Sequence, residues 1–124
     1  MIPDTVISKW PEHARHELAE FVAREIGCKP SDVYAAGSRV FGGFRPNSDI
    51  DIAVRGEGVF FMKLIFKGTK VSVMVRAEPK SPYGKWNLPV INLITGQQTE
   101  GNQKHIQIFK ARQKNHMSFE IEVW

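Results

Sequence analysis

The first regular pattern along the chain is an apolar residue at every fourth position between residues 10 and 27. The repeating positions are Ala14, Leu18, Val22 and Ile26. This spacing places the apolar side chains on one face of a helix and predicts an amphipathic helix. Pro11 suits the first turn of that helix, Gly27 suits its end, and Pro30 prevents its continuation.

The next patterns are those of β-strands. Val33–Ala36 is a short apolar run that Gly37-Ser38 ends, and at most one helical turn precedes the loop that follows. In Asp49–Val54, every second residue is a large apolar one. A strand would place these three residues on one face and Asp49, Asp51 and Ala53 on the other. Val59–Phe66 and Lys70–Arg76 flank Gly68-Thr69, so we expect a hairpin, with Ser72 and Met74 on the face opposite its three valines.

Regular patterns are weaker after residue 76. Residues 77–103 are rich in Pro, Gly, Asn and Gln, with a short apolar run at Leu88–Ile94, and we expect little regular structure there. Residues 104–116 have four basic side chains and no acid, which suits a polar helix or a basic arm. In residues 117–124, apolar residues occupy every second position, and this pattern predicts a strand.

These elements predict a single domain of the α/β class over residues 1–124. We expect a small mixed, largely antiparallel sheet with one main N-terminal helix. Of the 124 residues, 42% are apolar and 24% are charged, which is the range of globular proteins. The absence of an apolar stretch of about 18 residues argues against a membrane span. The first residues lack the pattern of a secretory signal, so we expect a cytoplasmic protein.

Cysteine and histidine usage limits the kinds of metal site. The single cysteine, Cys28, excludes an internal disulfide and a zinc site made of several cysteines. His13 and His16 are three positions apart on the predicted helix, without acidic or cysteine ligands arranged beside them. We therefore expect solvated histidines rather than a metal site.

The net charge of +4 is unevenly distributed. Residues 1–62 contain nine acidic and seven basic residues, whereas residues 63–124 contain ten basic and four acidic residues. A basic half can attract a polyanion such as a nucleotide or nucleic acid, although basic residues more often form a solvated surface.

Two short motifs carry candidate chemistry. Gly37-Ser38 follows a strand and opens a helical turn, where glycine allows close backbone approach and free N–H groups favour a phosphate. Asp49 and Asp51 lie on one face of a strand, about 6.6 Å apart along it. Two carboxylates so placed suit Mg²⁺, which typically binds carboxylates, water and substrate phosphate.

Together these motifs, in AGSRVFGGFRPNSDIDIAV, resemble the nucleotidyltransferase superfamily that includes DNA polymerase beta and the minimal bacterial nucleotidyltransferases. The resemblance covers about residues 10–76 and leaves a loop-rich, basic part at 77–124. It implies that Gly37 and Ser38 hold the β- and γ-phosphates of a nucleoside triphosphate such as ATP. Asp49 and Asp51 would be the catalytic carboxylates that bind Mg²⁺. Arg39 would assist the phosphate site, unless it pairs with a surface acid, and Ser38 has a helix cap as its alternative role.

The sequence departs from the superfamily at one position. Members usually supply a third carboxylate from a neighbouring strand, but the matching polar position in KVSVMV is Ser72. A neutral hydroxyl is a poor base and a poor metal ligand, so Ser72 does not take the role of the third carboxylate. Glu57 and Glu78 are the nearest acids that could substitute, and neither follows the strand alternation.

Three functions remain open from the sequence. The first is Mg²⁺-dependent transfer of a nucleoside monophosphate to an acceptor, with release of pyrophosphate. The second is a catalytically weak or inactive module of the same fold that binds a nucleotide or a partner protein, as an antitoxin binds its toxin. The third is a nucleic-acid-binding protein that uses the basic segment 104–114.

Overall fold

A computed structural model describes residues 1–55, 60–76, 89–99 and 111 of the chain. Its helices and strands are, in chain order, η1 (Ile7–Lys9), α1 (Glu12–Ile26), η2 (Pro30–Asp32), β1 (Val33–Ala36), α2 (Ser38–Phe41), β2 (Ile50–Arg55), β3 (Phe60–Phe66), β4 (Thr69–Arg76) and β5 (Ile91–Asn92). None of the helices in these ranges is long and apolar enough to cross a membrane.

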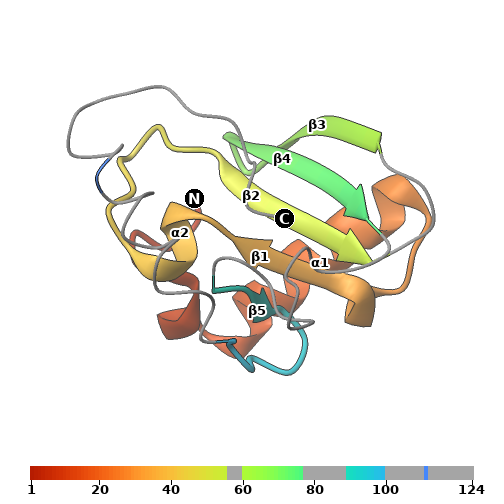
Figure 1. The fold of residues 1–124 in the computed structure, drawn as a ribbon, viewed down its shortest axis with the longest axis horizontal. Coiled ribbons are helices and arrows are strands. Elements are labelled where there is room, and N and C mark those ends of the chain that lie inside the picture. Colours follow the sequence, from red (N-terminus) through yellow and green to blue (C-terminus); the bar gives the residue numbers. More distant parts are fainter. Residues whose placement is uncertain (56–59, 77–88, 100–110, 112–124) are drawn as a thin grey trace.

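The five strands form one sheet in the order β3-β4-β2-β1-β5 (Figure 1). β1 pairs antiparallel with β2 and with β5, and β3 pairs antiparallel with β4. The central pair, β2 and β4, is parallel. The sheet is therefore mixed and largely antiparallel, as the sequence predicted.

One face of the sheet packs against α1, as Figure 1 shows. The alternate apolar residues of β1, β2 and β4 are buried in this layer together with those of α1. The main members of this core are Leu18, Val22, Val33, Ala35, Ile50, Ile52, Val54, Val71, Val73 and Val75. The strand alternation therefore directs Asp51 and Ser72 to the opposite face, as predicted.

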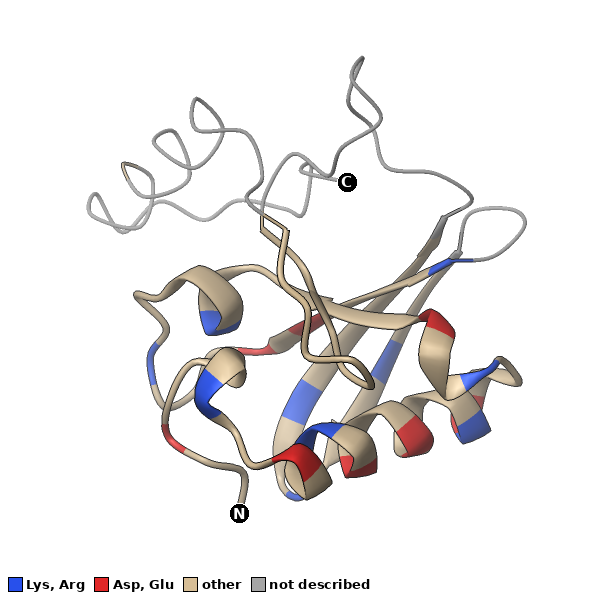
Figure 2. Ribbon diagram, turned by 90° about the horizontal axis from the view of Figure 1, so that it is seen from below, with Lys and Arg blue, Asp and Glu red and all other residues tan. Residues whose placement is uncertain are grey.

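The ends of α1 follow local sequence signals. Pro11 is the residue immediately before the helix, and Gly27 ends it in a left-handed conformation with φ of 77°. Glycine adopts this conformation without the steric cost that a β-carbon adds. Acidic and basic residues both occur along α1 (Figure 2), and the residues that this helix buries are Leu18, Ala19, Val22 and Ala23.

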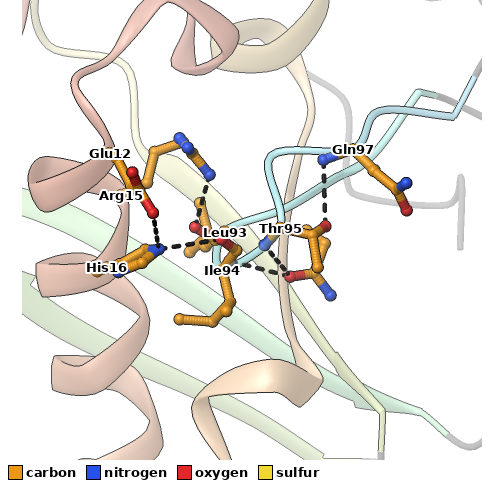
Figure 3. Close-up of polar contacts among 8 residues, drawn as sticks. Glu12, Arg15, His16, Leu93, Ile94, Thr95 and Gln97 are labelled. Carbon is orange, nitrogen blue, oxygen red and sulfur yellow. Dashed lines mark hydrogen bonds and ion pairs between the residues drawn. The ribbon is translucent and has the colours of Figure 1, made fainter.

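The segment after β5 is held against α1 by polar contacts (Figure 3). Arg15 donates a hydrogen bond of 2.9 Å to the carbonyl of Leu93, and His16 Nε2 lies 3.0 Å from the carbonyl of Ile94. His16 Nε2 also lies 3.6 Å from a carboxylate oxygen of Glu12. The expectation that His16 is merely solvated is therefore wrong, because this side chain joins two distant parts of the chain.

The structure confirms the predicted hairpin and differs from the sequence analysis in small ways elsewhere. β2 begins at Ile50, so Asp49 is the last residue of the preceding loop. The apolar run at Leu88–Ile94 contains β5, a strand that the sequence analysis did not predict. Several expectations lie outside the described residues: the candidate third acids Glu57 and Glu78, the segment 77–103 apart from 89–99, the polar helix or basic arm at 104–116 apart from residue 111, and the strand at 117–124.

Candidate active site

Asp51 lies on β2 at the centre of the sheet, on the face away from α1. Its neighbours in register are Ala36 on β1 and Ser72 on β4. Ser72 is in turn opposite Lys63 on β3. The pairing therefore brings three polar residues from three adjacent strands into one row, with neighbouring strands about 4.8 Å apart.

Gly37 brings the end of β1 directly against this row. A β-carbon at position 37 would collide with Oδ2 of Asp51, and the backbone there has φ of 74° and ψ of −158°. Both the contact and the conformation require glycine. The Gly37-Ser38 motif and Asp51 are thus adjacent in space, as the two-motif interpretation requires.

Asp49 is placed by the loop that precedes β2 and by Ser72. The Ser72 hydroxyl donates a hydrogen bond of 2.9 Å to Oδ2 of Asp49. Lys63 Nζ lies 3.6 Å from the same oxygen. The residue that replaces the expected third carboxylate therefore orients one of the two aspartates.

Arg39 holds the loop itself. Its side chain is 2% exposed and donates hydrogen bonds of 3.1 and 2.7 Å to the carbonyl of Ser48, the residue before Asp49. A further bond of 3.4 Å reaches the carbonyl of Pro46, and the guanidinium stacks over Phe44 at 4.7 Å. The structure gives Arg39 no ion pair with an acid among the described residues, so the surface pairing considered above is not observed.

Ser38 is the first residue of α2, and Gly37 is the residue that caps this helix. No side-chain hydrogen bond caps α2, so the alternative role of Ser38 as a helix cap is not observed. Ser38 is partly exposed next to buried Gly37. Its predicted contact with phosphate stays a prediction.

Burial and charge perturb the acidity of Asp51. Loss of solvent raises the pKa of its carboxyl from 3.8 to about 7, and the nearby negative charge of Asp49 acts in the same direction. Lys63 and Arg39 lower this pKa to a smaller extent. The surroundings of Asp51 therefore disfavour its negatively charged form. A cation bound beside the carboxylate would stabilise that form.

The donor set fits a hard divalent cation. Asp49 and Asp51 offer carboxylate oxygens, the ligand type that Mg²⁺ prefers. Among the described residues, no group of three or more His, Cys, Asp or Glu side chains gathers at one place, so the pair is not supplemented by a third acid there. Such a pair suits a cation whose remaining ligands come from water or a bound phosphate.

The sequence analysis missed Lys63 as a part of this site. The sequence did mark this residue as unusual. Lys63 is the one charged residue in the run FFMKLIF, and it lies on the face opposite Met62 and Leu64. Its partner could not be read from the sequence, since that required the order β3-β4-β2.

Comparison with known proteins agrees with this geometry. A family model described as a nucleotidyltransferase domain matches residues 15–114, which is most of the chain. The chain therefore belongs to the nucleotidyltransferase domain family. Searches of curated proteins and of solved structures found no match.

Proposed function

We propose that this protein is a Mg²⁺-dependent nucleotidyltransferase that uses a nucleoside triphosphate. The observation that carries the proposal is the contact of Gly37 with Asp51, which joins the candidate phosphate loop to the candidate metal carboxylates. The family membership supports nucleotidyl transfer as the general reaction.

In the proposed reaction, an acceptor hydroxyl or phosphate oxygen attacks the α-phosphorus of the triphosphate. A new oxygen–phosphorus bond forms, the bond from the α-phosphorus to the bridging oxygen breaks, and pyrophosphate leaves with the electron pair. A proton lost by a hydroxyl acceptor goes to solvent. Mg²⁺, when bound, would neutralise the negative charge that gathers on the phosphates.

Each residue of the site has a role in this proposal. Asp49 and Asp51 hold the cation, while Gly37 and Ser38 bind the β- and γ-phosphates. Arg39 is a positioning residue, because its hydrogen bonds to Ser48 fix the loop that delivers Asp49. Its positive charge also acts on Asp51 from a distance.

Calorimetric titration with each nucleoside triphosphate tests the proposal. We expect binding that requires Mg²⁺ and that is lost in the double variant Asp49→Asn/Asp51→Asn. Asp32→Asn is the matched control, because Asp32 precedes β1 at the end of that strand away from Gly37. Circular dichroism checks that each variant is folded. Equal binding by the wild type and the double variant would refute the site.

A second candidate is a nucleotide-binding or antitoxin-like module with little or no activity. The observation that favours it is Ser72, which lies beside Asp51 where a third carboxylate is expected and bonds to Asp49 instead. The two candidates separate when labelled nucleotide is incubated with the protein and possible acceptors. Binding without transfer of label or release of pyrophosphate would support the inactive module.

A further inference from the structure

The geometry points to Lys63 as a built-in counter-ion: its ammonium, rather than a second metal ion, offsets the negative charge at Asp49, so that this site binds nucleoside triphosphate with one divalent cation. This inference rests on the proposed function and deepens it. It concerns Lys63, which is not part of the Gly37-Ser38 motif or of the Asp49-Asp51 motif. Lys63 lies on β3, the first strand in the order β3-β4-β2-β1-β5.

The first argument is the sharing of one oxygen. Oδ2 of Asp49 accepts the hydroxyl of Ser72 at 2.9 Å and lies 3.6 Å from the ammonium of Lys63. The hydrogen bond from Ser72 uses one lone pair of this oxygen, and the nearby positive charge of Lys63 opposes the binding of a metal ion to the same oxygen. In this proposal the single cation binds Oδ1 of Asp49 together with Asp51.

The second argument is charge. Two aspartates carry two negative charges, and Lys63 offsets one of them at close range. A second divalent cation would have to enter beside the ammonium, and among the residues that the structure describes no third carboxylate joins this group. A neutral hydroxyl at position 72 does not compensate.

The third argument is mobility of the charge. The Lys63 side chain is 77% exposed, whereas that of Asp49 is 29% exposed. A long exposed lysine is a flexible point charge with three donors, and it binds phosphate as readily as carboxylate. The three donors of the Lys63 ammonium can therefore contact Asp49 and a bound phosphate at the same time.

Counting bound Mn²⁺ by electron paramagnetic resonance tests the inference without relying on activity. The probes are Mn²⁺ alone, and Mn²⁺ with an ATP analogue that has a methylene bridge between the α- and β-phosphorus atoms. With the analogue, we expect one Mn²⁺ per wild-type chain. We expect Lys63→Gln to bind a second Mn²⁺, and to bind Mn²⁺ alone about tenfold more tightly, because the competing ammonium is gone.

Two variants separate charge from structure. Lys63→Arg keeps the charge and should keep the wild-type count. Lys67→Gln removes a lysine of the same hairpin that pairs with Glu17 of α1 at 2.8 Å, and it should also behave as the wild type. Two ions in the wild type, or an unchanged count and affinity in Lys63→Gln, would overturn the inference and leave the proposed function standing. Failure of every variant to bind Mn²⁺ and analogue would refute the proposed function, and the inference with it.

Discussion

The α-carbon of Gly37 packs against the carboxylate of Asp51, so closely that a methyl group at position 37 would overlap Oδ2. This contact ties the turn after β1 to the start of β2. A residue that binds phosphate and a residue that binds metal must lie within reach of one ligand. The contact meets that requirement for the proposed roles of Gly37 and Asp51.

Gly37→Ala should destabilise the protein strongly. The backbone there has φ of 74°, and the new methyl group would also displace Asp51. Strain of this kind costs about 1–3 kcal/mol before the collision is counted. Urea unfolding measures the loss. Gly42→Ala is the matched control, since Gly42 has φ of 106° and open space around its β-position. Equal losses in the two variants would contradict the close contact.

The metal-free protein should lose stability as the pH rises from about 4 to about 7. In this range the folded state keeps a proton on Asp51, whose pKa is raised to about 7, whereas the unfolded state has released it. The folded state therefore binds more protons, and the free energy of unfolding falls with increasing pH. Since one pKa unit corresponds to about 1.4 kcal/mol, the full effect is about 4 kcal/mol.

Urea midpoints measured at several pH values in EDTA check this effect. Asp51→Asn removes the titrating group, so it should flatten the pH dependence and be more stable than the wild type at pH 8. A wild type and a variant with parallel pH profiles would show that Asp51 ionises normally.

Ser72→Asp should make stability depend on metal. The new carboxylate would face both Asp49 and Asp51, and repulsion among like charges should lower the Tm of the metal-free protein by about 5 °C. Millimolar Mn²⁺ should restore the Tm, and nucleotidyl transfer should increase if a third acid is what limits it. Ser72→Asn has a similar size without the charge, and its Tm should not respond to Mn²⁺. A metal-independent Tm in Ser72→Asp would show that position 72 lies away from the cation.

Arg39→Ala should weaken both stability and nucleotide binding. It removes the buried Arg39 side chain, leaves the partly buried carbonyl of Ser48 without its two donors and frees the loop before Asp49. A loss of about 3 kcal/mol is expected in urea unfolding. Arg24→Ala, which removes an exposed arginine of α1, should change stability by less than about 0.5 kcal/mol. Similar values for the two variants would show that the loop does not depend on Arg39.

Alternation and helical periodicity were sufficient to predict most of the fold. The apolar faces of α1 and of the hairpin follow from spacing alone, because one buried layer dictates which side of each element is apolar. The same alternation placed Asp51 and Ser72 on the face away from α1. β5 was missed because two residues are too few for a periodic signal, and it forms through pairing with β1.

Partners separated by long stretches of chain could not be predicted. The contact of Lys63 with Asp49 depends on the strand order, and the roles of Arg39 and His16 depend on backbone carbonyls, which leave no trace in the residue pattern. Arg39 is the clearest case. Its place beside a phosphate motif suggests phosphate binding, whereas its burial against Pro46 and Ser48 gives it a role within the loop.

The hydrogen bonds between α1 and the segment after β5 have a consequence for the folding of the protein during its synthesis. Arg15 and its acceptor, the carbonyl of Leu93, are separated by 78 residues. At translation rates of 5–20 residues per second, the ribosome takes about 4 to 16 seconds to add that length of chain. The helix α1 is therefore synthesised several seconds before Leu93 exists, which gives chaperones time to bind its apolar face.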